Sequence, residues 1–243
     1  MLNPSESFES GDVRQLAIVA HELRNPVAAA SGALRMLERT AARVPEINQP
    51  LQIVQRQLDH VSRLVDDLVD AASVLTGMLS LHKEPVDLSQ VLLRAVQSCR
   101  HSIDAGGHQL EIVCRDTLLV HADAQRLTQV FVNLLDNAVK YSEPRGRISV
   151  TAECGADAAV VVVQDNGIGI RPDIIPRIFD FFVQGGTPLT GSTRGLGIGL
   201  ALAKQVVEGH GGVIEASSAG IGFGSSFCVR IPLVRAQATQ RTQ

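Results

Sequence analysis

Residues 13–43 read VRQLAIVAHELRNPVAAASGALRMLERTAAR, with apolar side chains at alternating steps of four and three. This heptad spacing is typical of a long helix that packs against a second helix. The apolar residues on this seam are Leu16, Ala20, Leu23, Val27, Ala30, Leu34 and Leu37. We therefore predict one continuous helix over most of the segment.

A second seam begins after an interruption at Pro45 and Pro50. Its members are Leu51, Val54, Leu58, Val61, Val65, Leu68, Ala72 and Leu75. Two helices with matched seams and a short connection predict an antiparallel hairpin. Leu64 and Val69 widen the apolar stripe beyond what one hairpin covers, so we expect two chains to pair into a four-helix bundle, as a homodimer. The alternative is that the hairpin packs on the second half of its own chain.

The second half alternates helical and strand patterns. Asp87 and Asp123 are typical N-caps for helices, and valine-rich alternation with glycine turns predicts strands. We expect a helix near 88–105, one that begins after Asp123 and includes Lys140, and one near 197–208, with strands near 110–114, 118–121, 147–152, 159–164, 213–217 and 225–231. The fold class is therefore α+β, a helical hairpin followed by a two-layer α/β sandwich with mostly antiparallel strands. The expected domains are residues 12–80 and 85–234, with a flexible tail at 235–243.

Composition excludes several kinds of protein. The net charge is -3 and no Lys/Arg cluster forms a basic stripe, so nucleic acid is excluded as a direct ligand. No apolar run reaches the roughly 18 residues of a membrane-spanning helix. The four cysteines are far apart and predict small buried side chains in a reducing, cytoplasmic compartment: Cys99, Cys114, Cys154 and Cys228.

His21 begins the string His21-Glu22-Leu23-Arg24-Asn25-Pro26. It follows a seam residue directly, so we expect it on the solvent-accessible flank of the helix. A neutral imidazole is a good nucleophile near neutral pH, and the adjacent Glu22 carboxylate can hold its proton-bearing nitrogen. Asn25 lies one turn later on the same face. Taken alone, such a histidine is more often a solvated surface residue.

Asn133, Asn137 and Lys140 stand at i, i+4 and i+7 of one predicted helix, on a face opposite its apolar residues. Two carboxamide oxygens one turn apart could hold Mg²⁺, which prefers oxygen ligands. Lys140 and Tyr141 could contact phosphate oxygens. The alternative is an ordinary solvated face.

Asp165 follows the valine-rich run 160–163, where its carboxylate could accept a hydrogen bond from an adenine amino group. Gly167 and Gly169 leave room for a purine and for a backbone turn. The alternative is a simple strand-to-loop turn, since Asp-Asn-Gly is common turn chemistry.

A second glycine-rich string, Gly195-Leu196-Gly197-Ile198-Gly199, precedes a predicted helix. Glycines let backbone N–H groups approach phosphate, and a helix N-terminus favours negative charge. Arg194 could touch the terminal phosphate, and the loop 171–194 could cover the nucleotide. A dinucleotide fingerprint is excluded, because the string follows a long loop rather than the first strand of a βαβ unit.

These motifs, in this order, resemble the catalytic core of a sensor histidine kinase of two-component signalling, over about Asp12 to Leu233. The resemblance implies a dimerisation and phosphotransfer hairpin and an ATP-binding sandwich of the GHKL (Bergerat) type. It makes His21 the phosphoacceptor and Glu22 its acidic partner. Asn25 stands where the family places a Thr or Asn that positions water for dephosphorylating a partner.

The remaining motifs match the family's nucleotide-binding boxes. Asn133 and Asn137 match the N box, with Asn137 as the expected magnesium contact. The other matched residues are Asp165, Gly167 and Gly169 in the first glycine box, Phe179 and Phe182 in the phenylalanine box, and Gly195, Gly197 and Gly199 in the second glycine box. Asn25, Val27 and Ala20 stand where Thr, Leu and Ser or Asp are commoner.

The resemblance implies ATP- and Mg²⁺-dependent autophosphorylation of His21, then transfer to an aspartate on the receiver domain of a separate response regulator. We expect the sandwich to swing on a hinge near His82 to Pro85. Because only a short polar lead precedes the hairpin, the signal is expected from a separate sensor protein or from a removed region. The alternatives are a phosphatase-biased regulator, a GHKL-type ATPase and a non-catalytic nucleotide-binding scaffold.

Overall fold

The computed structural model describes residues 23–34, 37, 48–75, 79–183 and 196–234. The chain divides into two compact units, Met1–Leu79 and Ser80–Gln243. Four of the predicted site residues lie outside the described residues: His21, Glu22, Arg194 and Gly195. The predicted tail at 235–243 also lies outside them.

The first unit contains helical residues 23–34 and the helix α2 (Asn48–Leu75). Arg24 donates from Nε and Nη2 to Oδ1 of Asp66, at 3.0 Å from Nε, and so ties the two helical segments together. Both side chains are exposed, so the pair contributes at most about 1 kcal/mol. The apolar contacts stabilise this unit more than the ion pair does, because Leu34, Val65 and Ala72 are buried.

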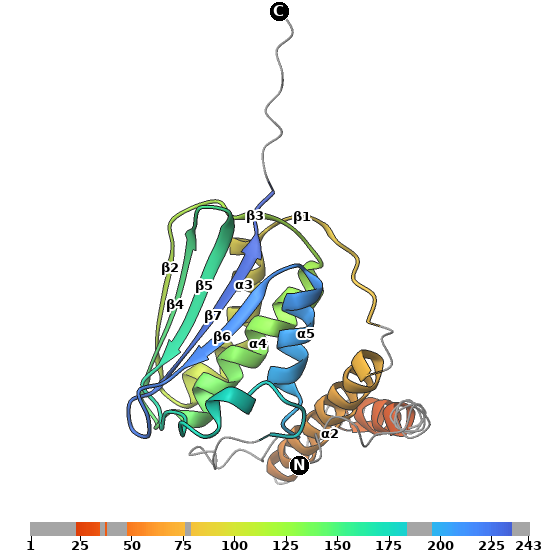
Figure 1. Ribbon diagram of the computed structural model, residues 1–243. Helices are drawn as coiled ribbons and strands as arrows, with labels where there is room; N and C mark the ends of the chain where they lie inside the picture. The colour runs from red at the N-terminus through yellow and green to blue at the C-terminus, as the bar shows by residue number, and fades with distance from the viewer. Residues whose placement is uncertain (1–22, 35–36, 38–47, 76–78, 184–195, 235–243) are drawn as a thin grey trace, which may run out of the picture. The chain divides into compact units, whose positions relative to one another are not determined.

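The second unit is a two-layer α/β sandwich (Figure 1). Three helices cover one face of a five-stranded sheet: α3 (Leu88–Ala105), α4 (Ala124–Tyr141) and α5 (Gly199–Gly209). The strand order is β2 (Gln109–Cys114), β4 (Arg147–Cys154), β5 (Ala158–Asp165), β7 (Ser225–Pro232) and β6 (Val213–Ser217). β2 is parallel to β4 and the other pairs are antiparallel. The predicted fold class is confirmed.

A second, two-stranded sheet joins β1 (Glu84–Asp87) to β3 (Leu119–Ala122). The sequence analysis predicted no strand at 84–87 and placed a hinge at His82–Pro85. The hinge prediction is wrong at its C-terminal end, because Glu84 pairs with Ala122 and Pro85 with His121. Proline is accepted there because a two-stranded sheet consists only of edge strands.

The core forms where the inward side of the sheet meets the helices. Along β5 the buried residues alternate, with Ala159, Val161 and Val163 facing the helices, as a period of two requires. Each α3 and α4 N-terminus is capped as predicted. The Asp87 carboxylate accepts from the N–H of Ser89, and the Asp123 carboxylate accepts from the two N–H groups that follow it by two and three residues.

The cysteines differ from the prediction that all four are buried. Cys99 is buried between α3 and α4, and burial, with the nearby Asp136 carboxylate, raises its pKa to about 12. Cys114 and Cys154 are exposed. They are the last residues of β2 and β4, where neighbouring elements no longer shield the side chains from solvent. None of the helices within the described ranges is long and apolar enough to cross a membrane.

Two buried histidines predict a loss of stability in mild acid. Burial lowers the pKa of His108 and of His210 below the ordinary value of 6.5. The unfolded chain therefore takes up these protons as the pH falls through 6.5, whereas the folded chain takes them up only at a lower pH. Stability is unaffected by these groups above about pH 7.5 and falls below 6.5, by up to about 1.4 kcal/mol per pH unit for each histidine.

Urea unfolding between pH 8 and pH 5.5 measures this effect. His210→Gln is expected to flatten part of the pH dependence, because glutamine does not titrate. A wild-type unfolding free energy that stays constant between pH 7 and 5.5 would contradict the prediction.

Candidate functional site

Asp165 ends β5 on the side of the sheet that faces the helices. Asp165 is 7% exposed, and its carboxylate accepts three hydrogen bonds. Oδ1 accepts from the N–H of Gly167 at 2.8 Å and of Ser225 at 3.3 Å, and Oδ2 accepts from the Ser225 hydroxyl. A carboxylate offers about four acceptor positions, so about one remains for a ligand. The carboxylate is thus oriented before any ligand binds.

The two glycines after Asp165 allow close backbone contacts. The N–H of Ile168 donates to the carbonyl of Tyr141 at 2.9 Å, and a Cβ on Gly167 would lie 2.2 Å from that carbonyl oxygen. Gly169 has φ +71°, and a Cβ there would lie 2.0 Å from the carbonyl oxygen of Gly220. Tyr141, which the sequence predicts as a phosphate contact, thus also holds this loop through its backbone carbonyl.

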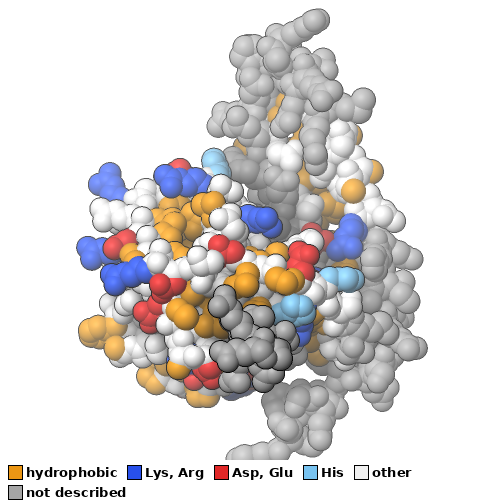
Figure 2. Space-filling model, turned by 90° about the horizontal axis from the view of Figure 1, so that it is seen from above, with side chains coloured by type: hydrophobic (Ala, Val, Ile, Leu, Met, Phe, Trp, Pro, Cys, Tyr) orange, Lys and Arg blue, Asp and Glu red, His pale blue; other side chains and the backbone are white. Residues whose placement is uncertain are grey.

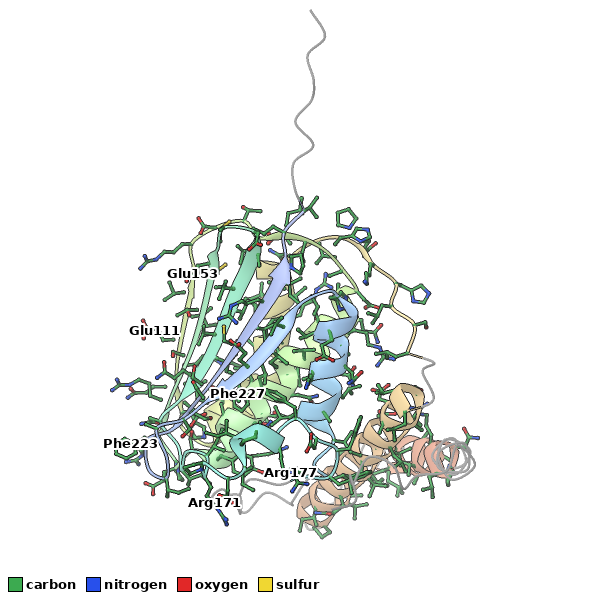
Figure 3. All side chains as sticks on the ribbon, in the orientation of Figure 1. Glu111, Glu153, Arg171, Arg177, Phe223 and Phe227 are labelled. Atoms are coloured by element: carbon green, nitrogen blue, oxygen red, sulfur yellow. The ribbon has the colours of Figure 1, made fainter. Side chains whose placement is uncertain are left out.

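The loop 218–224 completes the site, and no site residue was predicted in it. The Ser218 hydroxyl accepts from the N–H of Ile170 at 3.0 Å and donates to the carbonyl of Gly224 at 2.7 Å. The N–H of Gly224 donates to the carbonyl of Gly167 at 3.0 Å. Glycine at 220, 222 and 224 was the available signal. Phe223 projects outward from this loop, whereas Phe227 lies on the helical side of the sheet (Figure 3).

Gly224→Ala is expected to destabilise the protein by about 2 kcal/mol or more and to weaken nucleotide binding. Gly224 has φ +69°, and a Cβ there would lie 2.0 Å from the backbone oxygen of Asp165, which cannot move aside. Gly222→Ala is the matched control, because Gly222 has φ +85° but open space around it. The control should cost only about 1 kcal/mol. Equal unfolding free energies for the two variants would contradict the importance of this contact.

The predicted N box lies on the half-buried polar side of α4, away from the buried apolar residues of that helix. Asn133 is half-buried, and its Nδ2 donates to the carbonyl of Gly199 at 3.1 Å. This face is therefore partly covered rather than fully solvated, because α5 packs beside α4. Asn137 and Lys140 are also half-buried. Among the described residues, none forms a hydrogen bond with the Asn137 carboxamide, so its oxygen remains available.

The donor set near Asn137 suits Mg²⁺ better than a tightly ligated metal. No group of three or more His, Cys, Asp or Glu side chains within the described ranges could hold a metal ion. Mg²⁺ usually keeps several waters and binds through one or two protein oxygens together with phosphates. A single carboxamide oxygen fits that pattern.

Phe182 and Gly197 connect the two described segments on either side of residues 184–195, in the region predicted to cover the nucleotide. The N–H of Phe182 donates to the carbonyl of Gly197 at 2.9 Å. Gly197 has φ +73°, and a Cβ there would lie 2.7 Å from the carbonyl oxygen of Val183. Phe182 itself has φ +66° and is 46% exposed, a strained arrangement for an aromatic residue.

Phe179 anchors the segment before the cover. Its ring packs edge-to-face on Phe227 of β7, with ring centroids 6.4 Å apart. Ion pairs join Arg171 to Asp173 and Arg177 to Asp180 on the exposed side of the same segment. Arg171 and Arg177 both lie at this end of the sandwich (Figure 3).

The N-terminus of α5 follows Gly197. Ile198 is 1% exposed and anchors this end in the core. No side chain caps the helix, and half-buried Gly199 begins it. The N–H groups of the first turn are therefore available to an anion. Leu196, the residue before these glycines, is 37% exposed.

Asn25 is exposed on the described part of the first helix.

On the face of the molecule that Figure 2 shows, basic and acidic side chains are interspersed with apolar patches. That face therefore carries no large field of one sign.

Comparison with known proteins identifies both halves of the chain. Residues 122–235 match the family described as histidine kinase-, DNA gyrase B- and HSP90-like ATPase. Residues 13–77 match the His Kinase A (phospho-acceptor) domain. The structure of the mycobacterial sensor histidine kinase MprB is 30% identical, with a TM-score of 0.55 over 63% of this chain and 98% of that one. This chain belongs to the sensor histidine kinase family.

Two further similarities extend over most of the chain. The circadian input-output histidine kinase CikA of Synechococcus elongatus is 33% identical over 89% of this chain and 29% of its own length. The structure of full-length ShkA in complex with AMPPNP is 29% identical, with a TM-score of 0.72 over 92% of this chain and 46% of that one. The kinase chain thus spans about a third or less of the length of the curated relatives it matches, which also include the sensor protein KdpD of Clostridium acetobutylicum, at 24% of its length.

Proposed function

We propose that this histidine kinase chain binds ATP with Mg²⁺ in its sandwich, transfers the γ-phosphoryl group to His21, and passes it to an aspartate of a response regulator. The observation that carries the proposal is the pre-oriented Asp165 carboxylate in a glycine-lined strand end, in the same chain as a phospho-acceptor domain match. The AMPPNP complex of ShkA supports an adenine nucleotide as the ligand.

The described geometry supports a role for each nucleotide-binding residue. Asp165 accepts a hydrogen bond from the adenine amino group, while Gly167 and Gly169 let the backbone approach the purine. Asn133 holds α4 to the start of α5, and Asn137 supplies an oxygen to Mg²⁺. The N–H groups of Gly197, Gly199 and the first turn of α5 receive the phosphates.

The remaining roles come from the family pattern. Gly195 and Leu196 continue the phosphate-binding backbone, and Lys140, Tyr141 and Arg194 contact phosphate oxygens. Phe179 and Phe182 anchor the cover over the nucleotide. Bound Mg²⁺ neutralises charge on the transferring phosphoryl group.

Phosphoryl transfer then depends on the first helix. A neutral His21 nitrogen attacks the γ-phosphorus, the bond from phosphorus to the bridging oxygen breaks, and ADP leaves. Glu22 accepts the hydrogen bond of the other ring nitrogen and stabilises the positive charge that develops. Positioning and charge neutralisation supply most of the rate.

We place the dimerisation and phosphotransfer domain at residues 12–80 and the catalytic domain at 85–234. Several large apolar side chains of the helical segments remain exposed in the single chain: Leu23, Leu37, Ile53, Val54, Val61 and Leu75. An exposed stripe of this kind is costly in water and suits a second copy of the hairpin, which completes a four-helix bundle.

Dimerisation has a direct test. Val54→Glu and Val61→Glu each place a charge on the exposed stripe and should shift the chain from dimer to monomer in sedimentation velocity. Arg94→Glu on the exposed side of α3 is the control and should leave the dimer intact. A monomeric wild-type chain at micromolar concentration would contradict the bundle.

The kinase proposal is tested by incubating the chain with γ-labelled ATP and Mg²⁺. A label that is lost in acid and kept in base identifies a phosphoramidate on histidine. ATP hydrolysis without labelled protein would instead support a GHKL-type ATPase. The exposed Asn25 keeps dephosphorylation of a partner open as a second activity, and Asn25→Ala should slow it without reducing the label on His21.

A further inference from the structure

The linker between the helical unit and the sandwich contacts the sandwich before β1, the first strand of the sandwich, begins. The backbone N–H of His82 donates to Oδ2 of Asp123 at 3.1 Å. Two residues later, Glu84 begins β1 and pairs with Ala122. His82 is thus held to the start of α4 by a hydrogen bond that belongs to neither sheet.

Asp123 connects three elements through separate atoms. Its Oδ1 accepts from the N–H of Gln125 and of Arg126, and so caps α4. Its Oδ2 accepts from His82, and its own N–H donates to Nε2 of His210 at 2.9 Å. One residue therefore joins the linker, α4 and the C-terminal end of α5.

His210 holds the α5 side of this arrangement. The ring is 6% exposed, and its Nδ1 lies 2.7 Å from the carbonyl oxygen of Val206. Because Nε2 accepts from Asp123, the neutral ring carries its proton on Nδ1 and donates it to Val206. If the ring were protonated, Nε2 would also carry a hydrogen. Nε2 and the Asp123 N–H would then be two donors facing each other.

The charged groups near His210 are Lys83 on the linker and Asp123 at the start of α4. Burial is the main reason that the pKa of His210 lies below its ordinary value, and Lys83 lowers it further, while the Val206 carbonyl and Asp123 act in the opposite direction. The neutral ring is therefore the form present at neutral pH.

Leu81 packs where α5 lacks a side chain. A Cβ on Gly209 would lie 2.8 Å from Cδ1 of Leu81. Gly209 is the last residue of α5, and its backbone does not adopt a left-handed φ, so the helix itself does not require glycine. The absent side chain leaves a recess that the leucine occupies.

We propose that Leu81 and His82 dock into a joint formed by Gly209, His210 and Asp123, and that this docking positions the sandwich for phosphoryl transfer to His21. The proposal rests on the proposed kinase function. With the joint formed, the tether from the helical unit ends at Leu81. Without it, residues 81–83 become part of the tether and lengthen it by about 10 Å. A longer tether lowers the effective concentration of the nucleotide at the phosphoacceptor and loosens its orientation.

Gly209→Ala tests the joint without weakening the helix, because alanine is the better helix former. Its melting temperature and its affinity for a fluorescent ATP analogue should equal or exceed those of the wild type. The rate of His21 labelling at saturating ATP should fall roughly three- to tenfold, with an unchanged KM for ATP. An unchanged labelling rate would overturn the proposal.

Leu81→Ala should lower the labelling rate to a similar extent, because it removes the other half of the contact. Leu93→Ala is the matched control, since Leu93 is an exposed leucine on α3. The double variant of Leu81 and Gly209 should be no slower than either single variant, because both remove one interaction. Fully additive losses would show that the two residues act separately and would overturn the joint.

A measurement independent of catalysis separates this proposal from the kinase proposal. Hydrogen exchange of the His82 amide should be slow in the wild-type chain and fast in Gly209→Ala. A wild-type chain that takes no label but protects His82 would refute the kinase function and leave the docking intact. A His82 amide that exchanges equally fast in both chains would refute the joint, even in an active kinase.

Discussion

His21→Ala is expected to reduce incorporation of the γ-phosphoryl group by at least about 1000-fold, a loss typical of removing a nucleophile. The reason is chemical, since alanine offers no nitrogen to attack phosphorus. ATP affinity should stay within about twofold of the wild type, because His21 belongs to the helical unit and not to the sandwich. The measurements are a rate of labelling with γ-labelled ATP and a binding curve with a fluorescent analogue.

His101→Ala is the matched control for this experiment. His101 is an exposed histidine on α3 of the sandwich. The control should label at the wild-type rate. A His21→Ala chain that still takes up label at the wild-type rate would place the phosphoryl group on another side chain and would refute the proposed mechanism.

Asp165→Asn is expected to weaken ATP binding by about 100-fold, since hydrogen bonds to a charged group are worth about 1.5–3 kcal/mol each. The carboxylate accepts from Gly167 and from the N–H and hydroxyl of Ser225. In an asparagine at this position, the amide nitrogen donates hydrogen bonds instead of accepting them. It would therefore face either the Gly167 and Ser225 donors or the adenine amino group without an acceptor. Isothermal titration with ATP analogues measures the loss.

Two further variants identify its cause. Asp173→Asn removes an exposed carboxylate, paired with Arg171, from the same end of the sandwich, and should leave ATP affinity within twofold. Ser225→Ala keeps the charge but removes one of its donors, so its loss should be smaller than that of Asp165→Asn. A melting temperature near that of the wild type would separate a binding defect from unfolding. Wild-type affinity in a folded Asp165→Asn chain would exclude this carboxylate from adenine recognition.

Together the two variants distinguish the stages of the reaction. A chain without His21 should bind ATP and stop before transfer, whereas a chain with Asn at 165 should fail to bind. Mixing the two folded variants adds a further test. If phosphoryl transfer runs between the subunits of a dimer, a mixture should regain part of the label, because the intact sandwich of the His21 variant serves the intact histidine of its partner.

Local patterns in the sequence predicted most elements of this fold. Strand alternation along β5 and the Asp87 and Asp123 caps depend on neighbours within a few residues, so the printed sequence contains the information. The same holds for the motif residues, because each glycine string and the pair Asn133 and Asn137 lies within a few residues of sequence. The position of Asp165 at the end of a strand followed from the valine run before it, whereas its burial and its three donors are visible only in the structure.

The sequence by itself therefore determined the family, the α+β class, the order of the elements and the candidate residues. The tertiary structure alone decided the strand at Glu84–Asp87, the exposure of Cys114 and Cys154, and the loop 218–224 beside Asp165. It also decided the contact of Leu81 with α5 and the hydrogen bond of His82 to the start of α4. Each of these depends on contacts between segments tens of residues apart, such as Gly224 with Gly167 or His82 with Asp123. The spacing of residues along a chain indicates which of them share a face of one helix or strand. It does not indicate which distant segment packs against that face, because this depends on how all the elements pack together.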